Sequence, residues 1–122
     1  MLYNIYGQEI SKVSHQETFN CFYKLDKIER DKINSKLQEI INETSLKDNN
    51  KILTSSFIPG KDWTNTVFQP IYEKASDCNE ELAAKIFGLV LMQNFIDNDK
   101  EWVFMKPENT DIKGSYYFIK EY

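Results

Sequence analysis

The chain has 122 residues, of which 41% are hydrophobic and 14% aromatic. This length fits one domain over residues 1–122, and the apolar content excludes a disordered chain. The net charge of −4 comes entirely from residues 61–122, because residues 1–60 carry eight basic and eight acidic side chains. An acidic half argues against nucleic acid as the ligand, since phosphate binding needs a basic surface. It is compatible with a basic protein partner, and equally with a surface that only keeps the protein in solution.

The first residues contain no basic region followed by an apolar run, so no signal peptide is expected. The longest apolar stretch, Ile86–Met92, is too short to cross a bilayer. We therefore expect a cytoplasmic protein that has no membrane partner. In that compartment Cys21 and Cys78 should be reduced thiols.

Apolar periodicity predicts a strand and two helices in the first half of the chain. A short strand is expected at Leu2–Tyr6. The segments Ser14–Glu17 and Asp26–Glu29 have the spacing of a capping box, in which two side chains satisfy free N–H groups at a helix start. The first predicts a short helix with an aromatic face. The second predicts an amphipathic helix from Lys27 to about Glu43.

The most apolar element is predicted at residues 79–96, after a third capping-box pattern at Asp77–Glu80. Apolar side chains leave this helix little polar face, so it should be the buried centre of the fold. Gly88 in the interior of this helix is less favourable than alanine by about 1 kcal/mol. Because a glycine there often allows close packing, we expect a neighbouring backbone to approach the helix at this residue. Before it, Ile52–Ile58 is expected to be extended, and Pro70–Ala75 to form a short helix.

Two runs rich in β-branched and aromatic residues, Glu101–Lys106 and Ser115–Glu121, predict a C-terminal β-hairpin. An isolated hairpin is marginal in water, so this one must pack on the helices or join another strand. The predicted class is α+β, with helices packed around a buried central helix and a small antiparallel sheet that includes the C-terminal hairpin.

Candidate catalytic residues are few. His15 is the one histidine, and Cys21 lies six residues further along the same predicted helix, on nearly the opposite face. A meeting of Cys78 with His15 through the fold stays open, and with it a thiol enzyme. No glycine-rich phosphate loop occurs. We therefore expect a protein that is not an enzyme and that has no cofactor.

A metal site is also not expected. Asp97, Asp99 and Glu101 alternate like the start of a calcium loop, but the glycine and the distant bidentate glutamate of such a loop are missing. One histidine and two isolated cysteines do not have the spacing of a zinc site. These acidic residues are better interpreted as a solvated surface.

Aromatic side chains occur on both faces of the predicted C-terminal hairpin. One face must pack inward, and the other is either covered by the same domain or exposed as a binding patch. Acidic residues flank this hairpin and would give such a patch a negative rim. The predicted partner-binding residues are Asp97, Asp99, Glu101, Trp102, Glu108 and Asp111.

Three segments carry a resemblance to a known class of proteins. They are Pro59-Gly60-Lys61-Asp62-Trp63-Thr64, Phe68-Gln69-Pro70-Ile71-Tyr72-Glu73 and Phe87-Gly88-Leu89. Together with the size and acidity of the chain, they resemble small bacterial immunity proteins of polymorphic and contact-dependent inhibition systems. The resemblance implies tight binding to one cognate toxin, often a nuclease, without catalysis. It assigns no functional residue.

We interpret the chain as a cytoplasmic inhibitory binding protein, an immunity protein that blocks a basic toxin by steric and electrostatic occlusion. Three alternatives stay open. The chain could be a phage or mobile-element protein that blocks a host defence factor. It could be a small enzyme that uses Cys78 or His15, or a structural subunit that forms a homo-oligomer.

Overall fold

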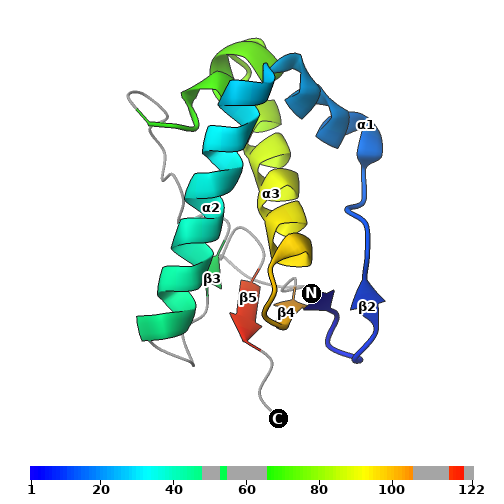
Figure 1. Ribbon diagram of the computed structural model, residues 1–122. Helices are drawn as coiled ribbons and strands as arrows, with labels where there is room; N and C mark the ends of the chain where they lie inside the picture. Colours follow the sequence, from blue (N-terminus) through cyan, green and yellow to red (C-terminus); the bar gives the residue numbers. More distant parts are fainter. Residues whose placement is uncertain (48–52, 55–65, 106–115, 120–122) are drawn as a thin grey trace.

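The computed structural model, which describes residues 1–47, 53–54, 66–105 and 116–119, combines helices with a small sheet whose strands gather near the N-terminus (Figure 1). The mixture confirms the predicted α+β class. The helical elements are α1 (Gln16–Phe19), the 3₁₀ helix η1 (Asn20–Lys24), α2 (Lys27–Lys47), the π-helical turn η2 (Ile71–Ala75) and α3 (Glu80–Asp97). The strands are β1 (Leu2–Tyr3), β2 (Glu9–Ile10), β3 (Leu53–Thr54), β4 (Trp102–Met105) and β5 (Tyr116–Ile119).

The five strands form one sheet in the order β2-β1-β4-β5-β3. The predicted C-terminal hairpin is present, since β4 and β5 pair antiparallel with Trp102 opposite Ile119. The predicted sheet is antiparallel, but the observed sheet is mixed. Strand β1 runs parallel to β4, with Leu2 opposite Trp102. Parallel neighbours need a long crossover connection, and here the helices between β1 and β4 supply it.

Helix α3 is the buried centre of the fold, as predicted. It contacts α1, α2, η1 and η2, and seven of its side chains are buried. Apolar surface on several sides leaves this helix no stable position outside the core. The buried side chains are Ala83, Ile86, Phe87, Val90, Leu91, Asn94 and Phe95.

Helix α2 packs beside α3 through a narrower stripe (Figure 1). Ile33, Leu37 and Ile41 repeat every four residues on this stripe and are fully buried. The helix ends at Lys47, one turn later than predicted. Its start is the predicted capping box, in which the Glu29 N–H donates to Asp26 Oδ1 at 2.8 Å and the Asp26 N–H donates to Glu29 Oε1 at 3.2 Å.

The other two predicted capping boxes are wrong. Helix α1 begins after His15, which has a left-handed φ of 54° and makes no capping hydrogen bond with its side chain. Helix α3 begins after Asn79, whose side chain accepts the Leu82 N–H at 3.1 Å. Asp77 and Cys78 have left-handed backbones, so the chain turns there. The N-cap of the helix is therefore Asn79 and not Asp77.

Shorter elements also differ from the prediction. Strand β1 covers only the first two residues of Leu2–Tyr6. Of the predicted extended run, residues 53–54 form β3, and residues 52 and 55–58 lie outside the described part of the chain. A Cβ atom placed on Gly88 would have no atom within 4 Å, so the predicted close approach of a neighbouring backbone is wrong. Gly88 is therefore a helix residue without a packing requirement for glycine.

Candidate interaction surface

Three of the predicted partner-binding residues lie together where α3 ends and the chain turns into β4. Asp97 and Asp99 are exposed, and Glu101 is half-buried. The Oε1 atom of Glu101 accepts the hydroxyl of Tyr3 at 3.3 Å, which ties this turn to β1. Glu108 and Asp111 lie outside the described residues.

Trp102 does not belong to this surface, which corrects the prediction. Its side chain is fully buried, and its indole N–H donates to Asn98 Oδ1 at 3.1 Å. The ring packs edge-on against Phe95, with 4.9 Å between ring centroids. Alternation along β4 turns this side chain toward the core, because residues on neighbouring positions of a strand face opposite sides.

A fourth acidic side chain, Glu9, joins the three through strand pairing. Glu9 on β2 is opposite Tyr3 on β1, and Tyr3 contacts Glu101. Sequence reasoning missed Glu9 because 88 or more residues separate it from the other three, and only the register of the sheet brings them near. We call the surface formed by Glu9, Asp97, Asp99 and Glu101 the acidic face.

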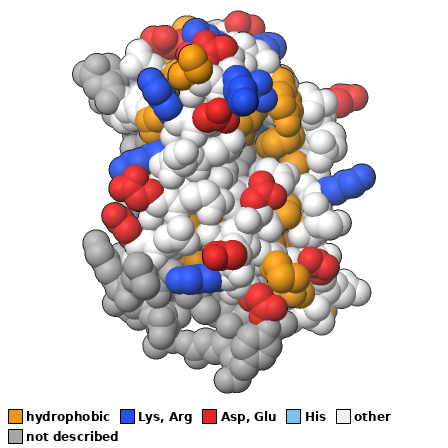
Figure 2. Space-filling view, in the orientation of Figure 1, with side chains coloured by type: hydrophobic (Ala, Val, Ile, Leu, Met, Phe, Trp, Pro, Cys, Tyr) orange, Lys and Arg blue, Asp and Glu red, His pale blue; other side chains and the backbone are white. Residues whose placement is uncertain are grey.

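The α-amino group of Met1 lies close enough to the acidic face to interact electrostatically with all four of its carboxylates. It donates to the carbonyl oxygens of Phe95 at 3.3 Å and Lys100 at 3.0 Å, and also to that of Asn98. Burial lowers the pKa of this amino group, and the four carboxylates act in the opposite direction. Figure 2 shows acidic side chains around an apolar patch, near the place where Figure 1 marks the N-terminus.

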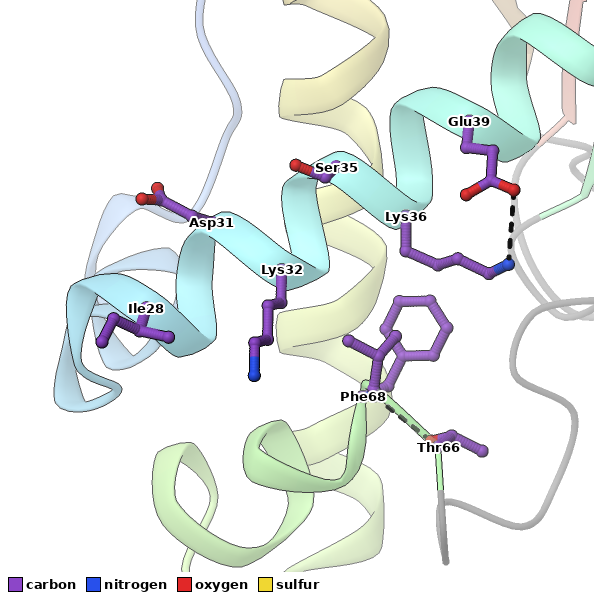
Figure 3. A pocket seen from close by; sticks show the side chains of 9 residues that line it. Ile28, Asp31, Lys32, Ser35, Lys36, Glu39, Thr66 and Phe68 are labelled. Carbon is purple, nitrogen blue, oxygen red and sulfur yellow. Dashed lines mark hydrogen bonds and ion pairs between the residues drawn. The ribbon is translucent and has the colours of Figure 1, made fainter.

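A separate hollow of about 770 Å³ lies along the outer face of α2 (Figure 3). Its helical wall presents Asp31, Lys32, Ser35, Lys36 and Glu39, and its apolar lining is Ile28, Val67 and Phe68. A second hollow of about 390 Å³ shares Lys32, Thr66 and Val67 with the first, so the two adjoin, and we call them together the α2 groove. This groove was not predictable from the sequence, because residues 66–68 are far from α2 along the chain.

The first hollow is balanced in charge, whereas the second adds the acidic side chains Glu29 and Glu73. Asp31 and Glu39 oppose Lys32 and Lys36, and Lys36 Nζ lies 3.8 Å from a carboxylate oxygen of Glu39. Its inner end is closed by Phe68, whose ring packs edge-on against Phe87 with 5.2 Å between centroids. The first hollow therefore has no electrostatic preference of the kind seen on the acidic face.

The residues considered for catalysis are not gathered at either hollow. His15, Cys21 and Cys78 are absent from the linings of both, and both cysteines are free thiols. Cys21 contacts the carbonyl oxygen of Glu17 at 3.8 Å, within its own helical segment. Among the described residues, no group of three or more His, Cys, Asp or Glu side chains could hold a metal ion.

Comparison of the chain with family models, with curated proteins and with solved structures found no match. Within the described ranges, no helix combines the length and the apolar character needed to cross a bilayer. The chemistry of the acidic face and of the groove is what bears on function.

Proposed function

We propose that this chain is a cytoplasmic inhibitory binding protein, an immunity protein that neutralises a cognate bacterial toxin by covering its active cleft. The observation that carries the proposal is the acidic face, where Glu9, Asp97, Asp99 and Glu101 surround the end of α3. Four carboxylates at one end of a small protein attract and orient a basic partner. A toxin that cuts nucleic acid has such a basic cleft, because it must bind phosphates.

The acidic face is held by hydrogen bonds, which favours tight binding. The Lys100 N–H donates to Asn98 Oδ1 at 3.1 Å, and Asn98 is buried. The Tyr3 hydroxyl holds Glu101 from the neighbouring strand. A surface that is already ordered loses little conformational entropy when it binds, so more of the contact energy appears as affinity.

Two positive groups of the described residues lie near the acidic face. Lys100 lies between Asp99 and Glu101 in the sequence, and the ammonium group of Met1 lies among the four carboxylates. The carboxylates still outnumber these two positive groups. Complementarity of this kind acts on the association rate and on the choice of partner.

Co-expression with the toxin domain encoded beside the gene tests the proposal. The wild-type chain should restore growth and co-purify with that domain, with an association rate that falls as salt concentration rises. Asp97→Lys combined with Asp99→Lys should abolish protection. Asp31→Lys combined with Glu39→Lys changes the net charge equally, but on the α2 groove, and should protect like the wild type.

The proposal is wrong if the wild-type chain neither protects the cells nor co-purifies with the toxin domain. Equal loss of protection in the two double variants would show that net charge, and not the acidic face, determines binding. Circular dichroism of each variant separates loss of binding from loss of folding.

A further inference from the structure

Exposed apolar side chains are concentrated at the N-terminus. Five large hydrophobic residues are exposed in the described part of the chain, and three of them lie within the first six residues. These are Met1, Ile5 and Tyr6, which are 40%, 57% and 82% exposed. Exposed tyrosines are common centres of binding energy at protein interfaces, because the ring offers a large rigid contact and a hydrogen-bonding hydroxyl.

The turn that carries Ile5 and Tyr6 is ordered by Asn4. The side-chain oxygen of Asn4 accepts the N–H groups of Tyr6 at 2.9 Å and Gln8 at 3.0 Å, and its side-chain amide donates to Gln8 Oε1 at 2.9 Å. The backbone N–H of Asn4 donates to the Gln8 carbonyl at 2.9 Å. Gly7 has a φ of +82°, which favours glycine and closes the turn. Ile5 and Tyr6 are therefore presented in a fixed arrangement.

This turn leads directly into the acidic face. Glu9 follows it on β2, and Tyr3, which precedes it on β1, contacts Glu101. Residues 1–11 contain no lysine or arginine, and the first basic side chain is Lys12. An interface with apolar side chains bordered by carboxylates requires an apolar pocket with a basic border on the partner.

We infer that the N-terminal hairpin, residues 1–10, is the apolar anchor of the acidic face and inserts Ile5 and Tyr6 into an apolar pocket of a basic protein. This inference rests on the proposed function and names the residues that supply its affinity. The carboxylates steer the partner and set its orientation, and the two apolar side chains slow its dissociation. Such a division is common, because rim charges act mainly on association and buried anchors on dissociation.

The remaining exposed apolar residues provide a matched control. Tyr23 is 58% exposed and Ile28 is 67% exposed, and both lie where η1 leads into α2. The guanidinium of Arg30 lies over the Tyr23 ring, 4.8 Å from its centroid, so this tyrosine has a partner within its own chain. Tyr23 thus matches Tyr6 in chemistry but lacks its position beside the acidic face.

The test is the dissociation constant of the full chain for the purified toxin domain encoded beside its gene, measured by calorimetry. Tyr6→Ala should weaken binding at least tenfold, since interface anchors commonly contribute that much. Ile5→Ser should weaken it in the same direction. Tyr23→Ala should bind like the wild type, and thermal melting should be unchanged for Tyr6→Ala, because that side chain is exposed.

Each other outcome overturns a defined statement. If the wild type binds and protects while Tyr6→Ala and Ile5→Ser bind equally well, the hairpin is not the anchor, and the proposed function stands. If the wild type does not bind at all, the proposed function is wrong, and so is the inference that the hairpin inserts into a pocket of a basic protein. A dimer in sedimentation that Tyr6→Ala dissociates would assign the hairpin to contacts between copies of this chain, and so overturn the inference.

Discussion

The side-chain oxygen of Asn98 accepts the indole N–H of Trp102 at 3.1 Å inside the core. The same oxygen accepts the Lys100 N–H at 3.1 Å. The amide nitrogen of Asn98 donates to Gln38 Oε1 at 2.7 Å and to Asn42 Oδ1 at 3.2 Å. One buried side chain thus uses all four of its hydrogen-bonding positions and connects α2, α3 and β4.

Asn98→Ala is therefore expected to lower the free energy of unfolding by about 2–3 kcal/mol, because it leaves the Trp102 indole and the Gln38 oxygen without partners away from water. Urea denaturation followed by circular dichroism measures this loss. Asn42→Ala is the control, since Asn42 is exposed and water can replace its weaker contact. It should cost about 0.5 kcal/mol. Equal losses in the two variants would contradict the central role of Asn98.

Asn98 belongs to a set of amides that link α2 to the C-terminal part of α3 and the turn after it. Asn34, Gln38 and Asn42 repeat every four residues on α2, beside its buried stripe, and the same spacing separates Asn94 on α3 from Asn98, which caps the end of that helix. Gln38 donates to the Asn94 side chain at 3.0 Å, and Asn94 donates to Asn34 at 2.9 Å. Amides with this spacing look solvated in one helix, and only the pairing of two helices shows that they face each other.

Asp26→Ala should lower the free energy of unfolding by about 1 kcal/mol, because it removes the side chain that accepts the Glu29 N–H at the start of α2. Chemical denaturation of the variant measures the change. Ser14→Ala alters a residue in the same sequence pattern, but His15 occupies the helix start there and no capping box forms. That variant should match the wild type within about 0.5 kcal/mol. A loss in Ser14→Ala as large as that in Asp26→Ala would contradict this assignment.

These capping patterns illustrate what local sequence can and cannot determine. Three segments have the same spacing, and one forms the box, because the backbone before the other two helices adopts left-handed conformations at His15, Asp77 and Cys78. The central helix and the C-terminal hairpin were predictable, because long apolar periodicity and aromatic runs reflect burial directly. The burial of Trp102 and the arrival of Glu9 at the acidic face depend on sheet register, which the sequence does not display.

Gly88→Ala should raise the free energy of unfolding by about 0.5–1 kcal/mol. Alanine is favoured over glycine in a helix interior, and the added Cβ at this position would meet no atom within 4 Å. Thermal melting measures the gain. Gly7→Ala is the opposite control, because a φ of +82° strains any residue with a Cβ and should cost about 1 kcal/mol. A loss of stability in Gly88→Ala would show that a neighbour must approach this helix after all.

Tyr117→Phe should make the protein less sensitive to alkali. Tyr117 is buried and stacks on Phe95, with 4.0 Å between ring centroids, and burial raises the pKa of its phenol well above the usual value of about 10. Above pH 10 the unfolded chain therefore loses this proton while the folded chain keeps it, so the unfolded state binds fewer protons and stability falls as pH rises.

The slope from this one group approaches about 1.4 kcal/mol per pH unit above pH 10, and the phenylalanine variant should lack it. Urea denaturation at pH 9, 10 and 11 measures the slope for each protein relative to its own stability at pH 9, which removes the direct effect of the substitution. Tyr6→Phe is the control, because it removes the hydroxyl of a tyrosine that is 82% exposed and lies outside the core. If Tyr117→Phe loses stability with pH as steeply as the wild type, the Tyr117 phenol ionises in the folded protein and is not shielded by the core.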